Sequence, residues 1–384
     1  MGKAGIYEML VRELYVLSLV TDAFGGHGGI ALYNRDFLQA ICAHPRIAGV
    51  TAFPRLISRE LENLPLKLAY ITTTLGGKFR YIVGVLRYVL PRPQVDLLVC
   101  AHINLLPFAF LLRIWFRVPI LLQIYGCEAW EPSRSKFANF LTRRVDIIVS
   151  ISEVTKQRFM AWSGVKAENI SILANAIHLN LYGLAQEKNG ELLRRYSLEG
   201  RVVLMTLGRI ATEEQYKGFD EVLEILPTLS KKIPNISYLI VGSGSDVRRL
   251  VEKARDLGVS ERVVFAGLVA EAEKAKHFSL ADVYVMPSYG EGFGFVFLEA
   301  MACGIPVIGS KTDGGREALR NGQLGELVDP KNPSEIISSI QNALSRPRLV
   351  PNGLIYFSFD NFQHRAHKII DHAFKGKEKT IRRK

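Results

Sequence analysis

Residues 283–302 read VYVMPSYGEGFGFVFLEAMA, and this stretch decides the fold. Its apolar start, 283–286, predicts a buried strand, and its end, 295–302, predicts a helix. The glycines between them let the backbone come close to a ligand. Because the start of a helix presents free N–H groups to an anion, the stretch predicts a parallel sheet with a binding site where the strand ends.

Short runs rich in Val, Ile and Leu alternate with helical patterns along the whole chain. The predicted strands are residues 14–20, 95–101, 120–125, 146–150, 202–207, 238–241, 263–265, 283–286 and 307–308. Apolar strands separated by helices are typical of parallel sheets covered on both faces. Since 384 residues are too many for one ordinary core, we predict an α/β protein. It has two Rossmann-like, doubly wound domains facing each other across a cleft, with a boundary near residues 180–200.

The net charge of +12 is unevenly distributed. Residues 1–185 carry 20 Lys and Arg against 12 Asp and Glu, and residues 375–384 carry six against one. A basic face of this kind suits an anionic membrane surface or a phosphate-bearing acceptor, although a solvated basic surface is the alternative. No nucleic-acid-binding module is recognised, so nucleic acid is not expected as a partner.

The sequence favours a cytoplasmic location, peripheral at the inner face of the membrane. The four cysteines are widely spaced, which suits a reducing compartment. Glu8 and Glu13 interrupt the region where a signal peptide needs an apolar core. Arg113 and Pro119 break the longest apolar stretch, 105–125, which is therefore not expected to span a bilayer.

Two cations follow the predicted strand 202–207. Arg209 comes directly after it, and Lys217 stands before the next helix. At the carboxyl end of a parallel strand both would point into the cleft and neutralise a departing diphosphate, with roughly 1.5–3 kcal/mol for each charge-assisted hydrogen bond. Solvated surface cations are the alternative.

Two acidic residues border the glycine-rich turn and its helix. Glu291 stands in the turn, where it would accept hydrogen bonds from sugar hydroxyls, and Glu299 lies eight residues further on, where it would hold a ribose diol. The alternative is a loop acid and a helix-surface acid without function.

The first half offers weaker candidates. Gly25 and Gly26 begin a glycine-rich loop after the first strand, where a phosphate or sugar would lie. This loop matches G-x-G-x-x-A, but no acidic residue ends the next candidate strand near 51–53, so we discount a dinucleotide site. His102 follows another predicted strand.

Tyr125 and Glu128 follow the predicted strand 120–125. Glu128 would act as a base or bind acceptor hydroxyls, and a structural role is the alternative for both. Metalloprotease, Walker and D-x-D patterns are lacking, so we expect no metal site.

Together these residues resemble the retaining glycosyltransferases of family 4, also called group 1, which have the GT-B fold. The resemblance covers nearly the whole chain. It is carried, in order, by GR at 208–209, KGFD at 217–220, IVGSG at 240–244, FAGLV at 265–269, the E-x7-E block at 291–299 and GELVDP at 325–330. Each piece is weak alone, but their order and spacing are highly specific.

The resemblance implies a role for each candidate. Arg209 and Lys217 would stabilise the diphosphate and Glu291 would bind the donor hexose, and these three are the predicted catalytic residues. The implied substrate-binding positions are Gly25, Gly26, His102, Tyr125, Glu128, Val269 for the base, the backbone at Phe293, Gly294 and Phe295, and Glu299 for the ribose. Family members retain configuration without a metal or cofactor, and the leaving phosphate takes the acceptor proton.

The resemblance also divides the chain. Residues 1–185 would bind the acceptor and 186–358 the nucleotide sugar, 359–374 would form a helix that crosses back to the first domain, and 375–384 would be a basic tail. There is one departure, since many members carry His where Tyr125 stands. We therefore predict only positioning at Tyr125.

We predict transfer of a hexose from a GDP- or UDP-linked donor, with mannose as the first candidate, to a glycan or polyprenyl-diphosphate-linked acceptor in polysaccharide or glycolipid synthesis. A nucleotide-sugar epimerase and a non-catalytic nucleotide-binding protein are the alternatives. On the membrane side, basic residues of the first half would dock on anionic lipid. Apolar residues would face the lipid-linked acceptor, namely Tyr81, Ile82, Val85, Leu86 and Val89.

Overall fold

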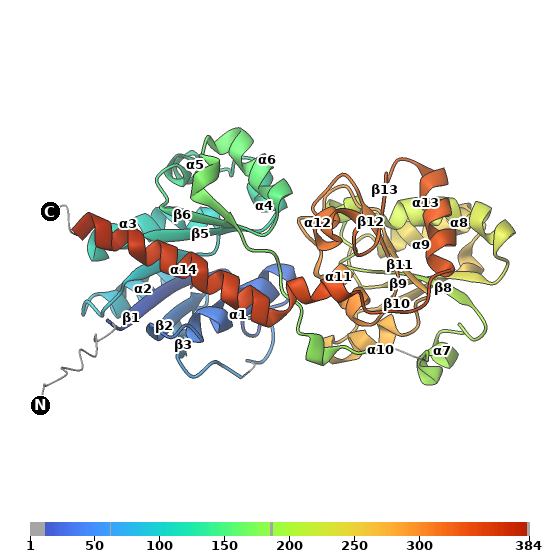
Figure 1. The fold of residues 1–384 in the computed structure, drawn as a ribbon, viewed down its shortest axis with the longest axis horizontal. Coiled ribbons are helices and arrows are strands. Elements are labelled where there is room, and N and C mark those ends of the chain that lie inside the picture. Colours follow the sequence, from blue (N-terminus) through green and yellow to red (C-terminus); the bar gives the residue numbers. More distant parts are fainter. Residues whose placement is uncertain (1–11, 62, 185–186, 382–384) are drawn as a thin grey trace, which may run out of the picture.

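The computed structural model describes residues 12–61, 63–184 and 187–381 (Figure 1). The domain boundary that we predict between residues 185 and 186 lies outside them and stays a prediction. Within the described residues the chain forms two parallel sheets, flanked by helices, at opposite ends of an elongated molecule.

The first sheet has seven strands in the order β3-β2-β1-β4-β5-β6-β7, and the second has six in the order β10-β9-β8-β11-β12-β13. The strands of the first are β1 Leu14–Val20, β2 Ile47–Pro54, β3 Leu68–Tyr70, β4 Leu97–Cys100, β5 Ile120–Ile124, β6 Ile147–Ser150 and β7 Ile170–Ile172. Those of the second are β8 Val202–Leu207, β9 Ile236–Val241, β10 Val263–Gly267, β11 Val283–Met286, β12 Val307–Ser310 and β13 Glu326–Val328. The predicted α/β fold with two doubly wound domains is confirmed.

The α-helices connect and cover these strands. They are α1 Gly29–Cys42, α2 Lys78–Val89, α3 Leu106–Phe116, α4 Cys127–Trp130, α5 Lys136–Thr142, α6 Glu153–Ser163 and α7 Gly190–Arg195. The remainder are α8 Phe219–Lys232, α9 Val247–Asp256, α10 Lys274–Phe278, α11 Phe295–Ala302, α12 Gly315–Ala318, α13 Pro333–Leu344 and α14 Phe359–Ile381.

Both faces of each sheet are buried, which explains why the strands read as continuous apolar runs. In β1, Val16 packs in the core shared with α1 and α14, whereas Leu17 packs in the opposite core with α2 and α3. This follows from the alternation of side chains along a strand. Three short strands, β3, β7 and β13, were absent from the predicted strands because three residues at a sheet edge carry too little periodicity.

The chain crosses between the domains twice, side by side. Ile177 on the outward crossing forms a parallel bridge with Ser358 on the return, and its N–H donates to the Phe357 carbonyl at 2.8 Å. Helix α14 then lies along α1 of the first domain (Figure 1). His367 on α14 bonds the Ala40 carbonyl at 2.8 Å. The predicted crossing helix is present, but it runs to Ile381 and so enters the segment predicted as a tail.

The structure corrects the apolar face that we predicted on α2. Tyr81, Val85 and Val89 are 3%, 0% and 3% exposed and pack in the core beneath the helix, because they fall on its inner stripe. They therefore cannot face a lipid. Ile82 lies on the outer side, 40% exposed.

Candidate active site between the domains

A cavity of about 190 Å³ lies between the two domains, where β11 ends and α11 begins. Its lining from the first half of the chain is Gly29, Ile30, Tyr33, Tyr125, Ile151 and Asn175; from the second it is Leu207, Gly208, Lys217, Met286, Glu291, Phe293, Gly294, Phe295 and Val296. Six predicted site residues thus meet here: Tyr125, Lys217, Glu291, Phe293, Gly294 and Phe295.

The loop before α11 is held by an aspartate that sequence reasoning missed. Asp313 is fully buried, and its Oδ2 accepts hydrogen bonds from the Ser288 hydroxyl at 2.7 Å and the Glu291 N–H at 2.9 Å. Its Oδ1 accepts one from the Gly315 N–H at 3.0 Å. Burial raises the pKa of Asp313 to about 6 although these bonds oppose the rise. Asp313 therefore fixes the backbone at Glu291 from behind.

Glycine is required where the two domains touch. A Cβ on Gly292 would lie 2.6 Å from the Tyr125 carbonyl oxygen, which is closer than side chains tolerate. Gly294 has φ of 89° just before α11, a left-handed conformation that favours glycine. These two glycines let the loop lie against β5 and turn into the helix.

Lys217 and Arg209 are both paired with Glu214, which the sequence analysis did not single out. The Lys217 side chain is 15% exposed, and its Nζ lies 2.8 Å from Glu214 Oε2. Arg209, at 70% exposure, contacts the other oxygen, Oε1. Burial lowers the pKa of Lys217, which the charge of Glu291 opposes. The two predicted phosphate-binding cations are therefore held together by one carboxylate.

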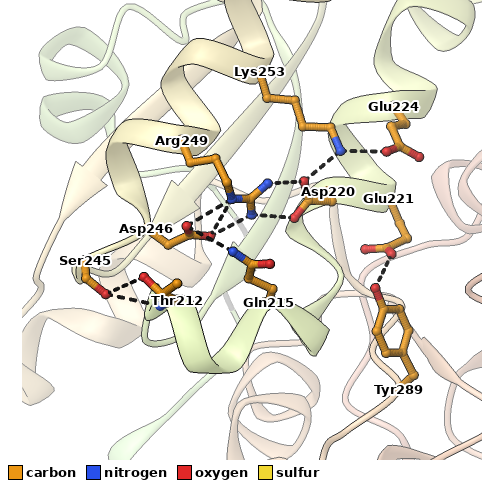
Figure 2. A network of polar contacts seen from close by, with 10 residues as sticks. All are labelled: Thr212, Gln215, Asp220, Glu221, Glu224, Ser245, Asp246, Arg249, Lys253 and Tyr289. Atoms are coloured by element: carbon orange, nitrogen blue, oxygen red, sulfur yellow. Dashed lines mark hydrogen bonds and ion pairs between the residues drawn. The ribbon is translucent and has the colours of Figure 1, made fainter.

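A polar network contacts the segment Thr212–Lys217, which carries Glu214 and Lys217 (Figure 2). Arg249 donates to both oxygens of Asp220, at 2.6 and 2.7 Å, and to both oxygens of Asp246, at 2.6 to 2.9 Å. Gln215 in the loop donates to Asp246 at 3.2 Å. Burial alone would raise the pKa of Asp220, but hydrogen bonds from Arg249 and Lys253 bring it below its ordinary value. The network anchors the segment that carries Glu214 and Lys217.

Glu299 lies in a neighbouring cavity of about 320 Å³ rather than on the helix surface. It is 2% exposed, so the alternative of a helix-surface acid is wrong. Its Oε1 accepts a hydrogen bond from Lys274 at 3.0 Å. Phe295 lines both cavities, which places Glu299 beside the first cavity.

Tyr125 and Glu128 have positioning contacts. The buried Tyr125 hydroxyl donates to Asn34 Oδ1 at 2.6 Å, and its role as a positioning residue stays a prediction. Glu128 Oε1 accepts hydrogen bonds from the N–H groups of Tyr125 at 2.5 Å and Gly126 at 3.2 Å. This oxygen is thus committed to the turn after β5, which gives Glu128 a structural contact where we predicted a base or an acceptor ligand.

The remaining predicted residues line neither of these cavities. The Gly25 carbonyl accepts from the N–H groups of Ser58 and Arg59, so Gly25 and Gly26 belong to a loop packed on its own domain. His102 Nδ1 accepts from the Asn104 N–H at 3.1 Å and caps the segment before α3. Val269 is half-buried beyond the end of β10.

The described residues 12–61, 63–184 and 187–381 contain no group of three or more His, Cys, Asp or Glu side chains that could hold a metal ion.

Comparison with known proteins identifies a family match for the second domain, which supplies one side of the first cavity. The family model described as glycosyl transferases group 1 matches residues 194–352. These residues belong to the glycosyl transferases group 1 family.

Two curated relatives match part of the chain. A GDP-mannose-dependent alpha-(1-6)-phosphatidylinositol monomannoside mannosyltransferase of Mycolicibacterium smegmatis is 30% identical over 231 residues, 58% of this chain and 59% of that protein. A phosphatidyl-myo-inositol mannosyltransferase of Mycobacterium tuberculosis is 33% identical over 215 residues, 53% of each. The match thus spans less than two thirds of either relative.

The fold has a close match over nearly the whole chain. The crystal structure of Anabaena Alr3699/HepE in complex with UDP-glucose superposes with a TM-score of 0.75 at 18% identity, covering 94% of this chain and all of that one. The two-domain GT-B architecture predicted from the sequence is confirmed.

Proposed function

We propose that this chain is a hexosyltransferase that moves a hexose from a nucleotide-diphosphate sugar to a lipid-linked or glycan acceptor. The observation that carries the proposal is the cavity in which Lys217, Glu291 and the first residues of α11 meet. A cation and free helix N–H groups favour phosphate, and a carboxylate accepts sugar hydroxyls. Mannose carried by GDP is the first candidate, because the names of both relatives specify mannosyl transfer.

Retention of configuration and independence of metal are parts of this proposal. The acceptor hydroxyl oxygen bonds the anomeric carbon on the face from which the phosphate departs. The bond from that carbon to the phosphate oxygen breaks, and the hydroxyl proton passes to the departing phosphate. Lys217 and Arg209 would stabilise the growing charge on the diphosphate, and they act only if Glu214 is displaced. No cofactor is required.

The test is a transfer assay with radiolabelled GDP-mannose and UDP-glucose, with and without EDTA. Phosphatidylinositol and a polyprenyl-diphosphate-linked sugar serve as acceptors. Label should enter the lipid phase in EDTA, and the product should have the configuration of the donor by NMR. Conversion of the donor without acceptor would establish an epimerase instead, and binding without turnover would establish a non-catalytic protein.

We further propose that the first domain docks on the inner, cytoplasmic face of an anionic membrane. Among the described residues, every helix is too short or too polar to cross a bilayer. Helices α2, α3 and α5 nevertheless expose apolar side chains, which are Phe79, Ile82, Ile114, Trp115, Phe137 and Phe140. Basic residues lie among them: the Arg144 guanidinium is 4.0 Å from the Phe140 ring centre, and that of Arg92 is 4.6 Å from Trp115. This basic, apolar face suits anionic lipid.

A further inference from the structure

Lys274 bridges two carboxylates beside the cavity that holds Glu299. Its Nζ lies 3.0 Å from Glu299 Oε1 and 2.8 Å from Glu271 Oε1. The Lys274 side chain is 12% exposed and that of Glu299 is 3% exposed, so this pair is withdrawn from solvent. A buried ion pair with defined geometry restricts the rotamers of both partners.

Because of this contact, the two oxygens of the Glu299 carboxylate have different surroundings. Oε1 accepts the bond from Lys274, whereas Oε2 is buried and has no hydrogen-bond partner of good geometry among the described residues. The Tyr182 hydroxyl is the nearby group that interacts with this carboxylate, and it lowers the pKa of Glu299. Glu299 also lines the cavity of about 320 Å³. A buried acceptor without a donor costs free energy, and a ligand hydroxyl entering this cavity would supply the donor.

The charge of Lys274 favours the ionised form of Glu299, against the effect of burial. Burial raises the pKa of Glu299, and Lys274 opposes this rise more than any other neighbour does. The other titratable groups that interact with the pair are Glu271, Tyr182, Cys303, Tyr284 and His27. An ionised carboxylate accepts hydrogen bonds about twice as strong as those of a neutral one.

We propose that Lys274 is a positioning residue for the nucleoside end of the donor, which holds Glu299 so that Oε2 faces the ribose hydroxyls. The inference rests on the proposed function, since it takes the ligand to be a nucleotide sugar. Lys274 does not itself touch the ribose. It acts by fixing which oxygen of Glu299 is presented to the cavity.

The experiment measures how strongly the chain prefers a nucleotide with the 2′ and 3′ ribose hydroxyls over one that lacks both. Dissociation constants of GDP and UDP are compared with those of their 2′,3′-dideoxy analogues for the full chain, with calorimetry as the readout. The wild-type chain should prefer its ribonucleotide by roughly 10- to 100-fold, the range expected for hydrogen bonds to a charged acceptor. In Lys274→Met this preference should fall to about one- to threefold, and Lys274→Arg should restore most of it.

A matched control lies on the same helix. Lys276 is 56% exposed and pairs with Glu273 at 2.9 Å, so Lys276→Met removes a lysine of the same helix, with its exposed ion pair, without touching Glu299. It should leave the preference unchanged. If Lys274→Met does not fold, Lys274→Gln keeps a donor without the charge and should lose part of the preference.

The outcomes separate this inference from the proposed function. A wild-type chain that binds neither nucleotide overturns the proposed function and this inference with it. A wild-type chain that prefers the ribonucleotide, with the same preference in Lys274→Met, overturns the inference alone. An equal loss in Lys276→Met also overturns it, because the effect would then be a general one of charge.

Discussion

Glu214 Oε2 lies 2.8 Å from the Lys217 ammonium and thus occupies the place at this cation where the proposed function requires a phosphate oxygen. The same carboxylate contacts Arg209 through its other oxygen. A diphosphate that binds both cations must therefore displace Glu214. One side chain thus bridges the two cations that would bind the diphosphate.

Glu214→Gln should bind a nucleoside diphosphate more tightly, by roughly three- to tenfold, because a neutral amide competes less well for the cations. Its melting temperature should fall slightly, since Lys217 loses its partner. Calorimetry with GDP and UDP measures the affinity. Glu213→Gln, one residue earlier, is the control and should bind like the wild type. Weaker binding by Glu214→Gln would show that Glu214 orients the cations for the phosphate and does not compete with it.

Lys217→Ala and Glu291→Ala should each lower the turnover number at least about 100-fold, because each removes a charged group that would act on the donor in the transition state. Their melting temperatures should change by only a few degrees, since neither side chain belongs to an apolar core. The measurement pairs the transfer assay with thermal unfolding. Near-wild-type turnover in either variant would remove that residue from the site.

Binding of a nucleotide sugar should weaken as the pH falls through about 6, the pKa of Asp313. Below that pH the buried carboxyl gains a proton and accepts less well from the Ser288 hydroxyl and the Glu291 N–H, so the loop is held less firmly. A nucleotide sugar is used because its phosphates are diesters, without the second ionisation of a phosphate monoester near pH 6.

Asp313→Asn should bind weakly at every pH and show no step near pH 6. The same pKa shift also predicts how stability depends on pH. The folded state binds the Asp313 proton more tightly than the unfolded state does, so the contribution of Asp313 to the free energy of unfolding falls as the pH rises from about 4 to about 6. A wild-type step near pH 6 that persists in Asp313→Asn would assign the titration to another group.

Phe79→Ser with Phe140→Ser should reduce binding to anionic vesicles about tenfold or more, because two rings that are 82% and 53% exposed would no longer enter the lipid interface. Co-sedimentation with phosphatidylglycerol vesicles measures it, and neutral phosphatidylcholine vesicles give the baseline. Leu349→Ser with Tyr356→Ser, two exposed apolar residues of the second domain, is the control. Equal binding of all three chains would exclude the α2, α3 and α5 face as the docking surface.

The features that could be predicted from the sequence are those formed by residues close together in the chain. The strand, turn and helix around Glu291 lie within one stretch of chain, and so do Gly294 and the start of α11. Lys274 and Asp313 could not be found this way, because each acts on a residue more than 20 positions away that folding brings near. Glu214 is local to Lys217, but its spacing alone did not show that it pairs with both cations. Asp313 left a weak signal, an Asp-Gly-Gly sequence that begins three residues after the end of β12.

The wrong prediction for the apolar face of α2 has a physical cause. Tyr81, Val85 and Val89 were placed on a lipid-facing surface, but a helix on a sheet buries one stripe, and the sequence alone did not show which. His102 and Gly25 follow strands of the first sheet as expected. The His102 ring accepts a hydrogen bond from the Asn104 N–H, and the Gly25 carbonyl accepts from Ser58 and Arg59. Neither residue lines the two cavities.

Thermal unfolding with GDP, UDP or no nucleotide, in EDTA, tests the nucleotide site most directly. A ligand at 100 times its Kd adds about 2.7 kcal/mol to the stability of the folded state. For a domain of this size that is a rise of roughly 5–10 °C. We predict such a rise with one of the two nucleotides, GDP if the hexose is mannose, and its loss in Lys217→Ala. A folded chain whose unfolding shifts with neither nucleotide would contradict the assignment of this cavity to a nucleotide-sugar donor.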